Sequence, residues 1–540
     1  MTDRFDIVVA GAGHNSLVAA AYLAKAGYKC LVLEGRSVLG GNVITEELTL
    51  PGFRHDSCGT AHVILQDSPM MIDDELGLAR DYGLEYINPE IVCHAPFMDG
   101  SWLTQYHDIE RTVAQFAKFS KKDADAYRRM IAEYDAIKPL FDASSYTPIG
   151  FGKPINDRLN EHPDGKKWLR RQAQSAWEII KDNFEDDHSR CFMLWMAFQT
   201  VTPPEWPMTG RLAYSLVWGR QRWSWCVPKG GSGVLTEKLA KIVEDNGGVA
   251  LTNKMVKALI VEGGKCVGVE CADGSSYRAE KAVLSTIHVK HLIDMAPRKL
   301  WADDFVEGIE SYKGGPTLFV SHYATKEPMT FKGDGGEITP IACAMLSEPT
   351  RALRMGYDFA RGVANVDEPV LLAVSPTIGD PTQAPPGHHT IKIIGMQPYD
   401  LKEGPAHWDT IKDGVAEANL NWLRKFSPNL TEDKILAKVV ESPLDLERRN
   451  PHNWHGSCHG GAQNAAQAAA LRPAPGWAQH RMPIPGLYQT GSTTHPGGSI
   501  SGGPGRNAAT VMLKDFGRSL DEVIAKKGSK TVRRAAVPAK

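Results

Sequence analysis

The sequence predicts an α/β protein, α+β overall, in which a Rossmann-type nucleotide-binding domain is joined to a domain of mixed antiparallel sheet and helices. Three observations support this fold class. An apolar strand at 5–10 ends in glycines and is followed by an alanine-rich helix and a second strand. A second glycine-rich turn lies near the other end of the chain, at 491–505. Between these two turns, some segments have apolar residues at helical spacing, and others have apolar and polar residues in the strict alternation of a strand.

Length and charge narrow the class of protein. A chain of 540 residues exceeds the ~250–300 at which one hydrophobic core stops growing, so we expect at least two domains. The formal net charge of −2 provides no basic surface for a nucleic acid. No apolar run reaches the ~18–20 residues of a spanning helix, so we expect no integral membrane segment. We therefore expect a small-molecule substrate, while peripheral membrane contact and homo-oligomerisation stay open.

The start of the chain and its cysteines bear on the compartment. Phe5 already begins an apolar strand, which leaves no room for a cleavable signal peptide. The nine cysteines are scattered and form no C-x-x-C pair, which favours reduced thiols over a disulfide framework or a zinc site. We interpret the acidic run at 182–188 as a solvated helix end rather than a metal site. These features predict a cytoplasmic enzyme that needs no metal.

Periodicity predicts the order of the elements. Residues 15–26 read as a helix that Gly27 ends, and 29–34 as the second strand of a right-handed βαβ unit. The later segments are an amphipathic helical subdomain at 105–145 and 168–200, α/β structure at 229–286, a half-buried antiparallel sheet at 315–400, a helix near 408–426 and a basic, disordered tail at 526–540.

The first turn carries a dinucleotide fingerprint. Gly11 and Gly13 supply the tight turn and the close approach of backbone to a pyrophosphate, and Ser16 takes the place of the third glycine. The pyrophosphate is expected on the N–H groups at the N-terminus of the helix that follows. Glu34 ends the second strand, where a carboxylate accepts hydrogen bonds from ribose hydroxyls and repels the 2′-phosphate of NADP.

Two further segments favour FAD over NAD. The run from Gly35 to Gly41 resembles the R-x-x-x-G-G segment of the amine oxidase and phytoene desaturase superfamily, where that segment lies along the ribityl and phosphate region of the flavin. The turn at 491–498 opens a helix near 506–512, which provides a second helix N-terminus for the flavin end of the cofactor.

Longer segments carry a more specific resemblance. The start AGAGHNSLVAAAYLAKAGYKCLVLEGRSVLGG is similar to the phytoene desaturase-like FAD-dependent oxidoreductases, as are PGFRHDSCGTAH, VPKGGSGVLTEKLAKIVEDNGG and RMPIPGLYQTGSTTHPGGSISGGPGRNAA. Among them the chain most resembles the pyridine nucleotide-disulphide oxidoreductase domain-containing protein 2 group. The resemblance implies a discontinuous FAD-binding domain at 1–105, 228–300 and 480–525, and a substrate domain at 106–227 and 301–479.

The fingerprint and the resemblance together predict the cofactor site. Val256 is implied to meet the adenine through its backbone. The predicted FAD-binding residues are Gly11, Gly13, Asn15, Ser16, Glu34, Gly35, Arg36, Gly40, Gly41, Asn42, Val256, Gly491, Ser492, His495, Gly498, Ser499 and Ile500. The chain departs from the family's G-A-G-H-N-G at Ser16. It departs from G-A-G-T-H-P-G-G-G at Ser492, Thr493 and Ser499.

The substrate side is predicted less sharply. His455 is the candidate catalytic residue, as a base or a substrate-binding group, and the alternative is a histidine that fixes its loop. The residues assigned to the substrate region are His55, Trp454, Cys458 and Tyr323. Cys458 lacks an S-G-G-C context, so we expect FAD to be bound non-covalently. After 453–459 the chain has an Ala/Gln/Asn-rich stretch where relatives carry Leu-Asp-Gln, which leaves the substrate open.

The predicted activity follows from the cofactor. We expect a desaturase or dehydrogenase that transfers hydride from a C–H bond of a hydrophobic or alicyclic substrate, with or without a neighbouring carbonyl, to flavin N5. The glycine turn at 229–233 lacks an acidic partner, so oxygen, a quinone or another non-NAD acceptor is expected. The alternatives are a flavin amine oxidase, with Trp454 and Tyr323 as its aromatic pair, and a non-catalytic flavin-binding interaction protein.

Overall fold

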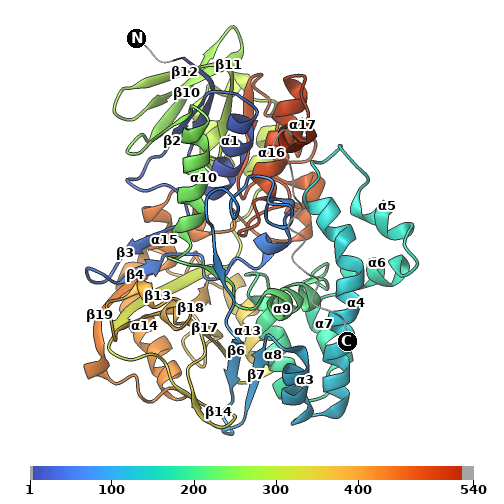
Figure 1. Cartoon of the computed structure of the whole chain (residues 1–540), viewed down its shortest axis with the longest axis vertical. Coiled ribbons are helices and arrows are strands. Elements are labelled where there is room, and N and C mark those ends of the chain that lie inside the picture. Colours follow the sequence, from blue (N-terminus) through green and yellow to red (C-terminus); the bar gives the residue numbers. More distant parts are fainter. Residues whose placement is uncertain (1–3, 526–540) are drawn as a thin grey trace.

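The computed structural model describes residues 4–525, and the predicted disordered tail at 526–540 lies outside them. Two seven-stranded sheets form opposite ends of the molecule (Figure 1). Most of the helices between 105 and 225 lie along one side. The predicted fold class is confirmed.

The first sheet contains the two strands of the predicted βαβ unit. Its order is β10-β11-β12-β1-β2-β9, with β20 paired to β12. Strands β9, β2, β1, β12 and β20 run parallel, whereas β10, β11 and the start of β12 form an antiparallel meander. The bounds are β1 Phe5–Ala10, β2 Cys30–Leu33, β9 Val249–Leu251, β10 Val256–Glu262, β11 Lys265–Cys271, β12 Ser276–Ser285 and β20 Leu487–Gln489.

Apolar side chains cover both faces of this sheet. Ile7 and Val9 of β1 pack in one core with α1 (His14–Lys25), α10 (Gly233–Asp245) and α16 (Gly503–Asp515). The alternate residues of β1 face a second core that includes β10, β11 and α12 (Asp303–Glu310). Burial on both faces explains the continuous apolar run from which the strand was predicted.

The two ends of the chain meet in this domain. Helix α16, from the C-terminal end, lies beside α1 (Figure 1). The contact is close because Gly505 has no side chain: a Cβ there would overlap the carbonyl oxygen of Asn15. Glycine-mediated packing therefore fixes the distance between the two helices.

The second sheet has the order β19-β13-β18-β17-β16-β6-β7. Its bounds are β6 Ile91–Pro96, β7 Trp102–Tyr106, β13 Thr317–Thr325, β16 Ala342–Met345, β17 Leu371–Val374, β18 His389–Gln397 and β19 Ile435–Glu441. All neighbouring pairs are antiparallel except β16 and β6. Strand β6 and all but the last residue of β7 fall within 1–105, yet both strands belong to this sheet; the predicted domain division stays a prediction.

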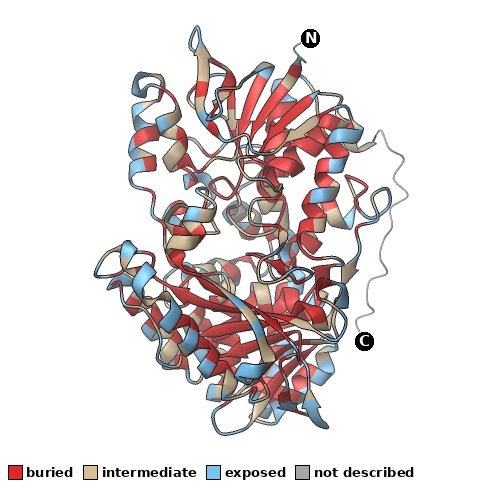
Figure 2. Ribbon diagram, turned by 90° about the vertical axis from the view of Figure 1, so that its left-hand side faces the viewer, coloured by how far each residue is buried: buried red, intermediate tan, exposed pale blue. Residues whose placement is uncertain are grey.

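The expectation that 315–400 forms a half-buried sheet was wrong. Strands β13 and β17 are buried along their full length, and so is β18 after its first residue. Helix α14 (Trp408–Arg424) covers one face, whereas α8 (Asp187–Phe198) and α9 (Leu212–Trp223) contribute to the core on the other. Figure 2 shows these buried strands below the first sheet.

The remaining elements frame the two sheets. The predicted helical subdomain and its neighbours comprise α3 Ile109–Ala117, α4 Lys121–Ser145, α5 Ile155–Asn160, α6 Gly165–Ala173 and α7 Ala176–Asn183, together with α8 and α9. The other elements are β3 Thr45–Glu47, β4 Arg54–Asp56, β5 Tyr86–Ile87, β8 Val227–Pro228, β14 Phe331–Gly333, β15 Gly336–Ile338, α2 Pro69–Ile72, α11 Val289–Leu292, α13 Pro349–Ala360, α15 Pro443–Arg449 and α17 Leu520–Ala525. Within residues 4–525, none of the helices combines the length and the apolarity that a bilayer span requires.

Candidate functional site

A cavity of about 1070 Å³ joins the two halves of the molecule. One end is lined by the glycine turns at the carboxyl ends of the first sheet's parallel strands, including Gly11 and Gly491. The other end is lined by strand residues of the second sheet, such as Leu372 and Ile394, and by side chains of α4 and α9. Ligands of open α/β sheets bind beyond the carboxyl ends of the strands, which is where this cavity begins.

The first glycine turn leaves a helix N-terminus open to the cavity. Gly11 has a φ of +96°, and a Cβ there would overlap the side chain of Thr286. Helix α1 begins directly after Gly13, and no side chain of the described residues caps it. Ser16, which is fully buried, donates from Oγ to the carbonyl of Gly11 at 2.7 Å or of Gly13 at 2.9 Å. The hydroxyl at the third fingerprint position thus ties the turn to the helix.

Glu34 holds the turn from the end of β2. Its Oε2 accepts the Ala12 N–H at 3.0 Å, and its Oε1 accepts the Arg36 N–H at 2.9 Å. Burial raises the pKa of the Glu34 carboxyl, although these N–H groups and the Arg36 guanidinium oppose the rise. A carboxylate with two acceptor oxygens has lone pairs left for ribose hydroxyls as well.

The second glycine turn leads into another helix. Helix α16 follows Gly502, whose φ is +69°; the hydroxyl of Ser501 accepts the Gly503 N–H at 3.2 Å, and Pro504 in the first turn has no N–H. Ser492 shares a hydrogen bond with Nε2 of His452 at 2.9 Å, and His495 donates from Nε2 to the carbonyl of Ser144 at 2.9 Å. The turn is thereby connected to the substrate half of the molecule.

The residues present fit a dinucleotide. The uncapped N-terminus of α1 faces the cavity, where it favours a negatively charged group, and the glycine turn before α16 lines the same cavity. The Asn15 side chain is buried, lines the cavity and has no partner for Oδ1 among the described residues. A Cβ on Gly41 would lie 3.1 Å from the Cα of Gly13, so the two glycines keep the backbone segments close.

The cavity gathers most of the predicted cofactor residues. The predicted residues that line it are Gly11, Gly13, Asn15, Glu34, Gly35, Arg36, Gly41, Asn42, Val256, Gly491, Ser492, His495, Gly498, Ser499 and Ile500, together with Cys458 from the substrate set. Ser16 and Gly40 do not line the cavity, but both are hydrogen-bonded to the first glycine turn. Ser16 donates to it as described above, and the Gly40 N–H donates to the carbonyl of Ala12. Their individual roles toward the cofactor stay predictions.

The predicted catalytic histidine lies outside the cavity lining. His455 has a φ of +52°, and its ring stacks on Tyr399 with 4.6 Å between centroids. Its Nδ1 is 3.6 Å from a carboxylate oxygen of Asp400, while its backbone N–H donates to Glu447 at 2.7 Å. The Trp454 ring also packs against the His455 ring, with 4.1 Å between the centroids. These contacts suit a histidine that fixes its loop, so the placement does not support a catalytic role, which stays a prediction.

Two other substrate-region residues, His55 and Tyr323, are also absent from the cavity lining. His55 shares a hydrogen bond with Thr49 at 2.8 Å and faces His322, and burial lowers its pKa to about 3. Tyr323, in β13, packs in the core beneath α14. Trp454 and Tyr323 are therefore not brought together at the cavity as an aromatic pair.

Sequence reasoning missed several histidines of the cavity wall. His14, His288 and His452 line it without having been assigned there, and His459, an ambiguous candidate beside His455 in the predicted segment 453–459, lines it as well. Burial lowers the pKa of His459 to about 4, with a contribution from the Arg472 guanidinium, so this ring is neutral at neutral pH. Its Nδ1 is buried without a partner among the described residues. Histidine next to the second glycine turn was the available signal, but several histidines between 452 and 495 made it ambiguous.

Two thiols meet in the cavity wall. Cys58 and Cys458 are hydrogen-bonded to each other, and both line the cavity. The hydrogen bond from Cys458, assisted by the Lys392 ammonium, lowers the pKa of Cys58 against the effect of burial. The same contact and burial raise the pKa of Cys458. The pair therefore contains one activated and one protected thiol.

A small ion cluster closes the helical end of the cavity. Lys138 Nζ lies 3.1 Å from Asp67 Oδ2 and 2.6 Å from Asp142 Oδ2, and all three residues line the cavity. Burial raises the pKa of both carboxyl groups, while the ammonium opposes the rise. Because one cation serves both carboxylates, this end is polar but largely charge-compensated.

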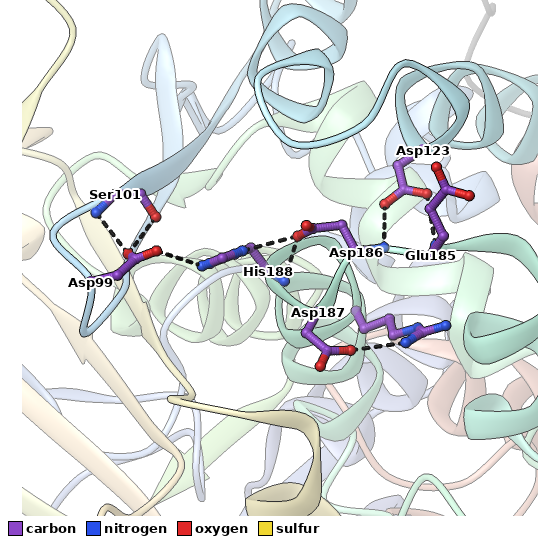
Figure 3. Close-up of polar contacts among 8 residues, drawn as sticks. Asp99, Ser101, Asp123, Glu185, Asp186, Asp187 and His188 are labelled. Carbon is purple, nitrogen blue, oxygen red and sulfur yellow. Dashed lines mark hydrogen bonds and ion pairs between the residues drawn. The ribbon is translucent and has the colours of Figure 1, made fainter.

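Side chains of the acidic run at 182–188 make hydrogen bonds and ion pairs with neighbouring protein groups (Figure 3). Asp186 caps α8 by accepting the His188 N–H at 2.8 Å, and it also contacts the His188 ring. Asp123 accepts the N–H groups of Glu185 and Asp186, and Asp187 pairs with an arginine one turn later. Within residues 4–525, no cluster of three or more His, Cys, Asp or Glu side chains is arranged to hold a metal ion.

The sheet, its two glycine turns and the shared cavity define a flavin-dependent oxidoreductase. The chain belongs to the family of flavin containing amine oxidoreductases, which it matches over residues 17–513, and this confirms the resemblance predicted from the sequence. It is 27% identical to the mouse pyridine nucleotide-disulfide oxidoreductase domain-containing protein 2, covering 95% of this chain and 94% of that protein. It is also 27% identical to a limonene dehydrogenase polypeptide of Castellaniella defragrans, covering 96% of this chain and 97% of that protein.

A solved structure agrees with the fold. An oxidoreductase from Methanosarcina mazei superimposes with a TM-score of 0.61 at 17% identity, over 94% of this chain and 99% of that one. At this identity the likeness concerns the fold alone. The chain is thus an oxidoreductase enzyme with a flavin cofactor, of the amine oxidase and phytoene desaturase superfamily.

Proposed function

We propose that this enzyme is an FAD-dependent dehydrogenase or desaturase that removes a hydride from a C–H bond of a substrate with a hydrophobic or alicyclic body. The observation that carries the proposal is the continuity of the cavity. It runs from the residues that fit a dinucleotide to an apolar wall formed by Leu318, Leu372, Ile394 and Met396. A flavin and an apolar substrate would therefore share one enclosed space.

The cofactor is proposed to be FAD, bound non-covalently. FAD contains an adenosine half, for which the end of the cavity near Glu34 and Val256 is suited, and a pyrophosphate, for which the uncapped N-terminus of α1 is suited. Cys458, the candidate thiol for a covalent link, is hydrogen-bonded to Cys58 and its pKa is raised, which disfavours attack on the flavin.

The chain's own part in the chemistry is binding, exclusion of water and proton transfer. A bound FAD supplies the acceptor for the hydride. Leu372 and Ile394 keep water from the apolar part of the substrate. His459, which is neutral and lines the cavity, accepts the proton that leaves the neighbouring carbon. His459 thus takes the role that the sequence predicts for His455.

The comparisons support a C–H substrate. Two relatives are named for limonene and for phytoene, whereas the likeness to amine oxidases is one of family and fold. The two aspartates of the cavity lining, Asp67 and Asp142, are both paired with Lys138 and so are not free to bind an amine. We further propose a cytoplasmic location, which is consistent with nine free cysteines in the described part of the chain, and oxygen, a quinone or another non-NAD acceptor.

The proposal is tested by anaerobic titration of the purified holoenzyme with cyclic ketones, polyenes and amines. Loss of the oxidised-flavin absorbance with a ketone or polyene, and not with amines, is the expected result. Reduction by amines alone would replace the proposal with amine oxidation. Reduction by NADH at a catalytic rate would contradict the proposed acceptor class.

A further inference from the structure

One cation of the cavity wall lacks the partner that its burial demands. Arg220, in α9, lines the cavity and is 5% exposed. Among the residues that the structure describes, no carboxylate forms an ion pair with it. Its Nη1 donates to the sulfur of Met196 at 3.0 Å, and its Nε is buried without a partner. Buried charges are otherwise paired or fully hydrogen-bonded, because an uncompensated one is costly.

Two other buried cations show how this protein usually satisfies such groups. Arg472 is 1% exposed and donates to five backbone carbonyls, among them that of Ser492 at 2.8 Å. Lys392 is 3% exposed and donates to the carbonyls of Asp56 and Cys58, each at 2.9 Å. Neither needs a ligand. Arg220 differs from both, since a sulfur atom is a weak acceptor.

The guanidinium of Arg220 is nevertheless held firmly. Its Cζ lies 4.2 Å from the centroid of the Trp225 ring and 5.2 Å from that of Trp195. The indole N–H of Trp225 donates to the carbonyl of Thr60 at 2.9 Å, and that of Trp195 to the carbonyl of Leu371 at 2.8 Å. Two anchored rings thus orient the cation, while cation–π contacts leave its N–H donors unused.

Burial lowers the pKa of Arg220 only to about 10, so the side chain keeps its charge at neutral pH. A planar guanidinium with unused donors matches the geometry of a carboxylate, to which it binds through two parallel hydrogen bonds. The cavity also has an apolar wall at Leu318, Leu372 and Met396. A ligand suited to both features has an apolar body and one carboxylate.

We propose that Arg220 forms a carboxylate subsite, so that the substrate of this enzyme is an apolar or alicyclic carboxylic acid whose carboxylate pairs with the guanidinium. The inference rests on the proposed function, since it names the substrate class of the same cavity. It adds a specificity that the hydrophobic wall alone does not provide, because a neutral hydrocarbon would leave the buried cation unpaired.

Binding to the oxidised holoenzyme tests this without turnover. Isothermal calorimetry compares a series of carboxylates of increasing apolar body, from hexanoate to decanoate and including cyclohexanecarboxylate, with the corresponding neutral amides. For the wild type we expect carboxylates to bind roughly tenfold or more tightly than their amides. In Arg220→Met this preference should disappear, while amide binding stays within about twofold of the wild-type value.

Two variants make the outcome decisive. Arg222→Met is the matched control, since Arg222 is exposed on the same helix and also lies over a tryptophan ring, 5.4 Å from its centroid. It should keep the carboxylate preference. Arg220→Lys keeps the positive charge but loses the planar pair of N–H donors, so it should weaken carboxylate binding roughly fivefold or more. This variant tests the subsite even if Arg220→Met does not fold.

The inference is overturned if wild-type enzyme binds no carboxylate of the series, or if Arg220→Met or Arg220→Lys keeps the full preference. Failure of this kind is distinct from failure of the proposed function. A flavin that neutral ketones or polyenes reduce, in an enzyme without carboxylate preference, would leave the dehydrogenase proposal standing and remove the subsite.

Discussion

The carboxylate of Glu34 accepts a hydrogen bond from the backbone N–H of Ala12, with 3.0 Å between Oε2 and N. The end of β2 is thereby tied to the first glycine turn, and the same carboxylate reaches Arg36. One side chain supports two of the backbone segments that line the cofactor end of the cavity.

Removing this carboxylate should weaken cofactor binding. We expect Glu34→Ala to raise the dissociation constant for FAD roughly 10–100-fold, since a hydrogen bond to a charged group is worth about 1.5–3 kcal/mol. Titration of apoprotein by quenching of FAD fluorescence measures the effect. Glu280→Ala, at an exposed position of the same sheet, serves as control. A Glu34→Ala constant within about twofold of the wild-type value would count against the assignment.

How far the sequence predicts this site depends on the range of the contacts. Gly11, Gly13 and Glu34 were predicted because a strand, a turn and a helix follow one another within one βαβ unit, and their geometry is local. The second sheet is predicted as antiparallel, but the burial of its strands is not predicted. The helix that covers one face, α14, comes late in the chain, and of the strands in this sheet only β19 follows it.

The far wall of the cavity was not predictable in the same way. His455 and His459 are four residues apart, yet only His459 lines the cavity. The difference arises from the positive φ of His455 and from Arg472, whose guanidinium donates to the carbonyls of His459 and Gly460 and so holds the loop. The periodicity of the sequence also does not reveal that Arg220 has no carboxylate partner, because the residues around its guanidinium come from distant segments of the chain.

The contact between the two chain ends is open to a direct test. Gly505→Ala should lower the free energy of unfolding by about 1–3 kcal/mol and release flavin more readily, because the added methyl overlaps the Asn15 carbonyl and pushes α1 from α16. Gly414→Ala, in α14 with nothing within 4 Å of the new methyl, should instead stabilise by about 0.5–1 kcal/mol. Urea unfolding compares the two. Equal stability of both variants would refute the packing argument.

If His459 is the base, its substitution should slow flavin reduction without changing the flavin content. We expect His459→Gln to slow anaerobic flavin reduction by about 10²–10⁴-fold, in line with the loss of a general base, with flavin content unchanged. His455→Gln tests the competing assignment, and a larger effect there would reverse it. Only the neutral ring accepts a proton, so the wild-type rate constant should be constant at neutral pH and fall as the pH drops through about 4, the pKa of His459.

The thiol pair predicts selective chemistry. Iodoacetamide should modify Cys58 before Cys458, because the hydrogen bond lowers the pKa of Cys58 and raises that of Cys458. The rate should increase with pH as the Cys58 thiolate forms. In Cys458→Ala the pKa of Cys58 should rise, and alkylation at neutral pH should slow. Peptide mass spectrometry assigns the modified residue, and preferential labelling of Cys458 would contradict the arrangement.

The central claim, a non-covalently bound FAD that lies against the uncapped N-terminus of α1, is tested most directly by acid precipitation of the purified protein, with chromatography of the supernatant and the pellet. The account predicts FAD in the supernatant, one per chain, and a colourless pellet. A yellow pellet, or FMN in place of FAD, would contradict it.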